Sequence, residues 1–175
     1  MNTFWEFLSA QYPNSTISAG NYWHAHSSSN QVISDCNITV LSQYGFLAVE
    51  GPDSSKFLQG QTTCDWRKID TEHAALGSYC NIKGRMVMSF IAGMQTSDAV
   101  LLRLHADTGD SACATLAKYI VFSKAKIRNA TEEYLAIGIS GKNARSKLIQ
   151  HIGMTPTASM TQVTDGKIVL VQLDD

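Results

Sequence analysis

The chain has 175 residues, of which 44% are hydrophobic and 17% are charged, a composition typical of a soluble globular protein. Fourteen basic and fifteen acidic residues give a formal net charge of -1, so no overall positive field attracts nucleic acid or an anionic membrane surface. No basic leader with a long apolar run begins the chain, and no apolar window of about eighteen residues occurs in it, so we expect a cytoplasmic protein.

The first 36 residues are expected to form an N-terminal helix and a polar loop. Apolar residues near the start recur at helical spacing, at Phe4, Trp5, Phe7 and Leu8. Pro13 ends this helix, and the small polar residues of 15–32 predict a surface loop in which His24 and His26 are exposed rather than metal ligands.

Residues 37–43 and 45–51 read as two short strands on either side of a turn at Tyr44. A helix follows, with Asp53 or Ser54 as its cap, and Gly60 is expected to end it. Tyr44 in the turn has two interpretations, packing in the core or stacking on a planar ligand.

Three β-prone runs separated by short turns predict an antiparallel meander, over residues 74–81, 85–94 and 99–105. The later elements are expected to be a helix over 109–122, strands over 125–128 and 134–140, a helix over 141–152 ended by Gly153, and a strand over 167–173. The predicted fold class is α+β, an antiparallel sheet packed with helices, formed by residues 37–175.

The stretch YCNIKGRMVMSF, residues 79–90, contains the most conspicuous charges of the meander. Gly84 suits a hairpin turn, and no second glycine or following Ser/Thr completes a phosphate loop. Lys83 and Arg85 are either solvated charges at a hairpin tip, or Arg85 presents its planar fork to a carboxylate.

The stretch FLQGQTTCD, residues 57–65, is interpreted first as a turn held by hydrogen bonds of its own amides and hydroxyls. Cys64 is a poor nucleophile candidate because the carboxylate of Asp65 raises a thiol pKa, although His73 could approach in space. The four cysteines (Cys36, Cys64, Cys80, Cys113) have neither CxxC nor zinc spacing, so we expect reduced thiols and predict no metal site. No catalytic residue is predicted.

Three segments together resemble the N-terminal region of the YgfZ folate-binding proteins, relatives of the glycine-cleavage T-protein: GPDSSKFLQGQTTCD, ALGSYCNIKGRMVMSF and KYIVFSKAKI followed by a strand ending in GISG. The resemblance covers roughly residues 37 to 173. It implies an aminomethyltransferase-like folate-binding fold within an architecture of about three domains. The family's KGCYTGQE-type signature is absent from this chain, so we expect the chain to be the N-terminal part of a longer protein.

The resemblance also implies which residues meet the ligand. The T-protein hairpin resembles TNEKGGILDDL, with an aspartate by the folate, whereas this chain has Met88 and Ser89 at the acidic pair. Neither side chain replaces a carboxylate, which argues against aminomethyl transfer. Tyr44 stands where the family usually has a folate-contacting tryptophan.

Beyond Tyr44, the expected cofactor-binding residues are Tyr79, Asn81 and Arg85, which would line the pocket or meet the glutamate tail. Cys64 stands where relatives commonly have asparagine, so no role is carried over to it.

The leading hypothesis is a tetrahydrofolate-binding protein that supports iron-sulphur cluster assembly or repair and, through it, tRNA modification. Iron-sulphur proteins would be its clients, with no membrane and no direct nucleic-acid partner. One alternative is a folate-dependent one-carbon transferase that uses Asp65 or His73. The other is an interaction domain without a ligand, for which Tyr44 would be buried in a core.

Overall fold

The computed structural model describes residues 35–173 continuously, together with Glu6, Ala10, residues 15–17 and residues 23–25. The strands are β1 (Ser15–Ile17), β2 (Trp23–Ala25), β3 (Asn37–Val40), β4 (Tyr44–Glu50), β5 (Ala75–Cys80), β6 (Met86–Thr96), β7 (Ala99–His105), β8 (Lys126–Asn129), β9 (Ile137–Ser140), β10 (Gln162–Thr164) and β11 (Val169–Val171). The helices are α2 (Ser54–Gln61), α3 (Gly109–Ala117) and α4 (Ala144–Ile152), with 3-10 turns η1 (Trp66–Lys68), η2 (Ala106–Thr108) and η3 (Ile120–Phe122).

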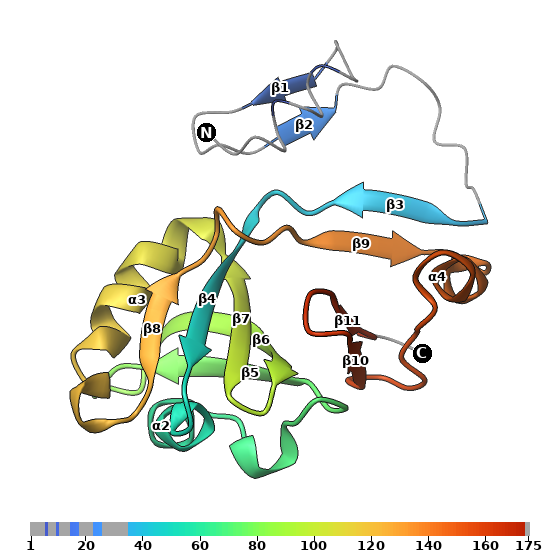
Figure 1. Cartoon of the computed structure of the whole chain (residues 1–175). Coiled ribbons are helices and arrows are strands. Elements are labelled where there is room, and N and C mark those ends of the chain that lie inside the picture. The colour runs from blue at the N-terminus through green and yellow to red at the C-terminus, as the bar shows by residue number, and fades with distance from the viewer. Residues whose placement is uncertain (1–5, 7–9, 11–14, 18–22, 26–34, 174–175) are drawn as a thin grey trace.

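A five-stranded antiparallel sheet with the order β5-β6-β7-β4-β8 forms the centre of the molecule (Figure 1). The predicted meander is confirmed as β5–β6–β7, and so is the α+β class with its antiparallel sheet. The chain returns from β7 through α3 to add β8 on the far side of β4. Strand β4 therefore lies inside the sheet and not at its edge.

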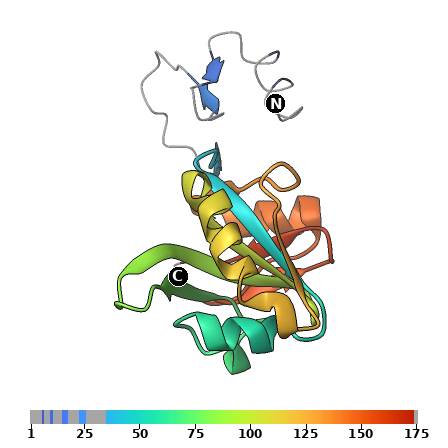
Figure 2. The ribbon, with the colours of Figure 1, turned by 90° about the vertical axis from the view of Figure 1, so that its left-hand side faces the viewer.

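The first face of the sheet carries the larger core. Alternate residues point to it, and they pack against Phe57 and Leu58 of α2 and against Ala112 and Leu116 of α3. The strand residues of this cluster include Leu47, Val49, Phe90, Val100, Leu102 and Leu104. Figure 2 shows α3 on one side of the sheet, with α4 and the C-terminal strands on the other.

The second face of the sheet is covered only in part. Phe46, Ala48 and Leu101 form a smaller core with Ala130 and Ala136, and Tyr134 and Val169 pack against it. The β10–β11 hairpin lies against this face through Val169 of β11, and the Gln162 side chain of β10 pairs with the backbone of Met94 in β6. Strands β3 and β9 pair in a separate two-stranded antiparallel sheet, with Asn37 opposite Ser140.

Several predicted elements differ from the structure. Residues 15–17 and 23–25, expected in a loop, form the antiparallel pair β1–β2, whereas the helix predicted around Phe4 and Trp5, and His26, lie outside the described residues. Tyr44 is the first residue of β4, because the turn comes earlier and the Tyr44 amide donates to the Leu41 carbonyl. The helix predicted over 109–122 ends at Ala117 and is followed by η3.

Asp53 is the N-cap residue of α2, but its side chain accepts a hydrogen bond from the Lys124 amide and makes no cap hydrogen bond.

Gly60 does not end this helix, which continues to Gln61. We expect the substitution Gly60→Ala to raise the free energy of unfolding by about 0.5–1 kcal/mol, because glycine is entropically costly inside a helix. A Cβ at this position would meet no heavy atom within 4 Å. Urea unfolding checks the prediction, and a lower midpoint than that of the unmodified chain would contradict it.

Candidate functional site

The tip of the β5–β6 hairpin places Asn81, Lys83 and Arg85 in solvent. The Asn81 side-chain oxygen accepts hydrogen bonds from the amides of Lys83, at 2.9 Å, and of Arg85, at 3.1 Å. Gly84 has a φ of 72°, as the predicted turn requires. Asn81 therefore holds the turn together, and the side chain of Arg85 lies at an exposed tip.

Tyr79 lies on the first face of the sheet, opposite Met88, and both side chains belong to the larger core. Burial raises the pKa of Tyr79 above its ordinary value, and the neighbouring Tyr119 raises it further. Tyr79 therefore points to the opposite face of the sheet from Tyr44, which packs against the smaller core. Of the four residues predicted to form the site, Tyr79 and Tyr44 thus lie on opposite faces of the sheet, while Asn81 and Arg85 lie at the exposed hairpin tip.

Tyr44 lies on the second face, at one end of an open strip that crosses four strands. The strip is defined by cross-strand neighbours whose side chains are half-buried or exposed: Leu76 and Ser78 of β5, Ser89 and Ile91 of β6, Arg103 and His105 of β7, and Tyr44 of β4. At its Tyr44 end the strip borders the smaller core. It offers a polar and aromatic surface beside an apolar wall.

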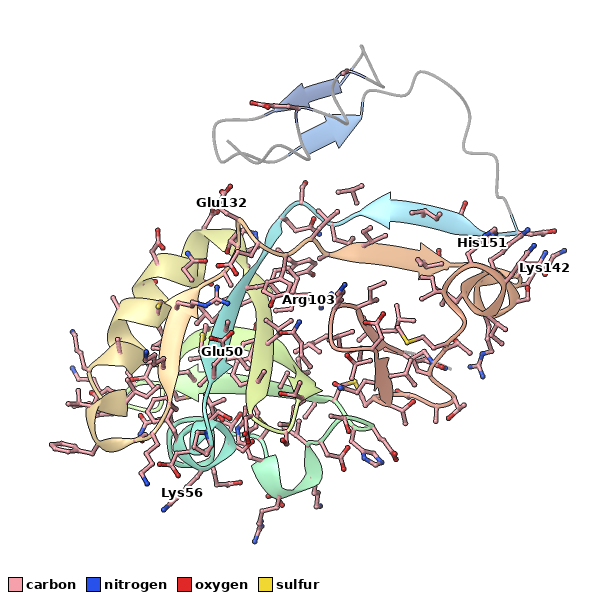
Figure 3. All side chains as sticks on the ribbon, in the orientation of Figure 1. Glu50, Lys56, Arg103, Glu132, Lys142 and His151 are labelled. Carbon is pink, nitrogen blue, oxygen red and sulfur yellow. The ribbon has the colours of Figure 1, made fainter. Side chains whose placement is uncertain are left out.

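Arg103 lies on this strip in direct contact with Tyr44. Its guanidinium carbon is 4.2 Å from the centroid of the Tyr44 ring, which is a cation–π geometry. Figure 3 shows Arg103 on the side of the sheet that faces β9, β10 and β11. Burial lowers the pKa of the guanidinium from its ordinary value, although the group remains a cation at neutral pH.

The two residues at the position of the acidic pair point in opposite directions. Met88 is buried on the first face, whereas Ser89 is exposed on the open strip opposite Ser78. Only position 89 could therefore present a carboxylate to a ligand on the strip, and in this chain it is a hydroxyl.

The acid and base considered for a transferase lie elsewhere. Asp65 forms an ion pair with Arg67 at 2.8 Å, and this arginine holds the pKa of the Asp65 carboxyl below its usual value. His73 is 2.9 Å from Asp70 in a surface loop. Neither side chain belongs to the open strip.

The stretch 57–65 is held by local hydrogen bonds, as predicted. The Trp66 indole donates to the Thr62 hydroxyl at 2.7 Å, and the Trp66 amide donates to the Gln59 side chain at 2.8 Å. The pKa of Cys64 is raised, chiefly by burial and only slightly by Asp65. Burial thus adds to the effect of Asp65 in making Cys64 a poor nucleophile.

Within the described residues, no group of three or more His, Cys, Asp or Glu side chains could hold a metal ion. None of the helices there has both the length and the apolar character needed to cross a membrane.

Sequence reasoning missed Arg103, although a signal was present. In AVLLRLH the residues Val100, Leu102 and Leu104 point to the larger core, so the alternation places Arg103 on the opposite face. A charged residue at that position of an interior strand is the feature that could have revealed it.

Comparison with known proteins identifies the relatives of this chain. Residues 3–168 match the family model of the GCVT N-terminal domain. The chain is 33% identical over 133 residues to the tRNA-modifying protein YgfZ of Colwellia psychrerythraea, which covers 76% of this chain and 40% of that protein. It is 30% identical to the YgfZ of Cronobacter sakazakii, over 75% of this chain and 39% of that protein.

The structure is also similar to a solved one, the glycine cleavage system aminomethyltransferase T from Bartonella henselae. The TM-score is 0.73 at 14% sequence identity, and the match covers 90% of this chain and 45% of that one. This likeness establishes a shared fold. The chain spans about 40% of the length of the YgfZ proteins described above.

Proposed function

Since the chain belongs to the family of the GCVT N-terminal domain, we propose that it is a folate-binding protein of the YgfZ type, in which residues 37–175 bind tetrahydrofolate. The pterin ring would pack against Tyr44 on the open strip. The predicted contributions of Tyr79, Asn81 and Arg85 remain predictions, of which the exposed Arg85 is the one best placed to meet the glutamate tail.

The observation that carries this proposal is the contact of Tyr44 with Arg103 on the partly covered face. A pterin is flat and has polar edges, so a site for it needs a planar apolar surface beside hydrogen-bonding groups. The half-buried tyrosine supplies the surface, and the guanidinium and the serines of the strip supply the polar groups.

The same surface argues against aminomethyl transfer. By the resemblance to the T-protein, that reaction depends on an aspartate beside the folate. None of the seven residues that define the open strip is a carboxylate, and Ser89 occupies the one position of the acidic pair that faces it. The proposal is therefore binding without transfer chemistry.

Tyr44 also bears on the alternative of a ligand-free interaction domain. A residue that serves only the core would be fully buried, whereas Tyr44 is half-buried and packs at the margin of the smaller core. Tyr44 is thus not fully enclosed by the core, which supports the folate proposal.

For the wider role we propose support of iron-sulphur cluster assembly or repair in the cytoplasm, with tRNA modification as the consequence. The name of the YgfZ relatives supports the link to tRNA modification. Cys64, Cys80 and Cys113 are free thiols, which suits a reducing compartment.

Isothermal titration of this chain with tetrahydrofolate tests the binding proposal. We expect saturable heat at ligand concentrations below about 1 mM. The substitution Tyr44→Ala should weaken binding about tenfold, since a stacked aromatic contributes about 0.5–1.5 kcal/mol beyond its buried area. Tyr44→Trp, with its larger ring, should bind more tightly than the unmodified chain.

The matched control is Phe122→Ala, because Phe122 is another exposed aromatic residue but lies in η3, outside the open strip and the predicted site residues. Its affinity should equal that of the unmodified chain. A lack of saturable heat in the unmodified chain, or equal losses in the two alanine variants, would contradict the proposal.

A further inference from the structure

Arg103 is a cation that the fold does not neutralise. Its Nε is buried and has no hydrogen-bond partner, and no other buried side-chain nitrogen or oxygen in the described part of the chain is left in this state. Its direct cross-strand neighbours are Phe46 and Ile91, which offer no acceptor. A buried donor without a partner is costly, so this arrangement calls for an explanation.

Three other arginines of the described chain, Arg67, Arg128 and Arg145, have side-chain partners. Arg128 pairs with Glu50 at 3.1 Å and also with Glu133, and Arg67 pairs with Asp65. Arg145 donates to the side chain of Gln172 at 2.9 Å. Within residues 35–173, no carboxylate forms an ion pair with Arg103. Its guanidinium instead lies over the ring of Tyr44.

The contact with Tyr44 orients the guanidinium without occupying its donors. A guanidinium that lies over an aromatic ring still donates its N–H groups outward in its own plane. A planar acceptor with two oxygens matches that fork, which is the geometry of a carboxylate bound through two parallel hydrogen bonds. The half-buried position makes such bonds stronger than at a fully exposed arginine.

We infer that Arg103 is the anion-binding residue of the open strip and binds a carboxylate of the ligand, with Tyr44 holding the guanidinium in place. This inference rests on the proposed function, because it assigns the glutamate carboxylates of a folate to a particular side chain. It replaces the exposed Arg85 with Arg103 as the principal contact of that group.

The test compares tetrahydrofolate with its dimethyl ester, in which both carboxylates are blocked, by isothermal titration of the unmodified chain and of Arg103→Gln. We expect the unmodified chain to bind the free acid about 30-fold more tightly than the ester, as for hydrogen bonds to a charged group. Arg103→Gln should bind the two compounds with affinities within about twofold of each other.

Arg128→Gln is the matched control, because Arg128 lies opposite Ala48 in the same sheet but is already neutralised by two carboxylates. This variant should keep the 30-fold preference. Arg103→Lys keeps the charge without the planar fork and should keep only part of the preference. Thermal unfolding of each variant establishes that it is folded before titration.

The outcomes separate the two proposals. If the unmodified chain binds neither compound, the folate proposal fails and this inference fails with it. If the unmodified chain binds both compounds equally well, or if Arg103→Gln retains the full preference for the free acid, the assignment to Arg103 is wrong while folate binding stands. The comparison of the two compounds on the unmodified chain needs no variant, so a poorly folded Arg103→Gln does not leave the inference untested.

Discussion

Replacing Gln162 by leucine should lower the free energy of unfolding by about 3 kcal/mol, because it leaves two buried backbone groups without partners. The Gln162 side chain is 1% exposed. Its oxygen accepts from the Met94 amide at 3.0 Å, and its nitrogen donates to the Met94 carbonyl at 2.7 Å. Leucine has a similar volume but offers neither a donor nor an acceptor, so β10 loses its polar attachment to β6.

Urea unfolding measures this loss, with the slope checked to show that the transition remains two-state. Gln150→Leu is the matched control, since Gln150 is exposed on α4, and it should change the free energy of unfolding by less than about 0.5 kcal/mol. A loss below about 1 kcal/mol for Gln162→Leu would falsify the view that this side chain fastens the β10–β11 hairpin to the sheet.

The substitution Gly51→Ala should cost at least about 3 kcal/mol, since it combines an unfavourable backbone conformation with a steric clash. Gly51 has a φ of 124°. A Cβ placed there would overlap the Lys124 carbonyl oxygen and come within 2.9 Å of the Ala125 Cα. Both atoms are backbone, so relief of the clash requires the end of β4 and the segment that leads into β8 to separate.

Gly84→Ala isolates the backbone contribution. Gly84 also has a positive φ, of 72°, but a Cβ there would meet no heavy atom within 4 Å. This variant should lose only about 1 kcal/mol, the cost of a left-handed conformation for alanine. Equal losses at positions 51 and 84, measured by thermal unfolding of both variants, would show that crowding at Lys124 is unimportant.

Local signals were sufficient for those parts of the fold that depend on neighbouring residues. The meander could be predicted because Gly84 marks a hairpin turn and apolar runs flank it. The end of α4 could be predicted because Gly153, with a φ of 81°, is the left-handed residue that closes it.

Pairing between distant segments could not be predicted in this way. Strand β3 pairs with β9, about one hundred residues later, and nothing in either stretch specifies the partner. Strand β10 has only three residues and was missed. Its attachment depends on one buried glutamine, a residue type that ordinarily indicates surface.

The candidate site was predicted only in part because its residues were judged by position along the chain and not by the face they occupy. Tyr79 and Ser78 are adjacent in sequence but point to opposite sides of the sheet. The same alternation separates Met88 from Ser89 and places Arg103 opposite the core positions of β7. Assigning each strand residue to one face of the sheet would have placed Tyr44 and Arg103 together on the second face.

The interior position of β4 has a consequence for biosynthesis. Glu50, its last residue, precedes the first residue of β7 by 49 positions and that of β8 by 76. At roughly 5–20 residues per second, a ribosome needs about 2–10 s to reach β7 after β4 has been made. During that interval residues 45–49, all buried in the folded chain, have neither sheet partner, and an unpaired apolar strand is prone to association with other chains. The risk of aggregation is therefore greatest on the nascent chain, before the sheet can close around β4.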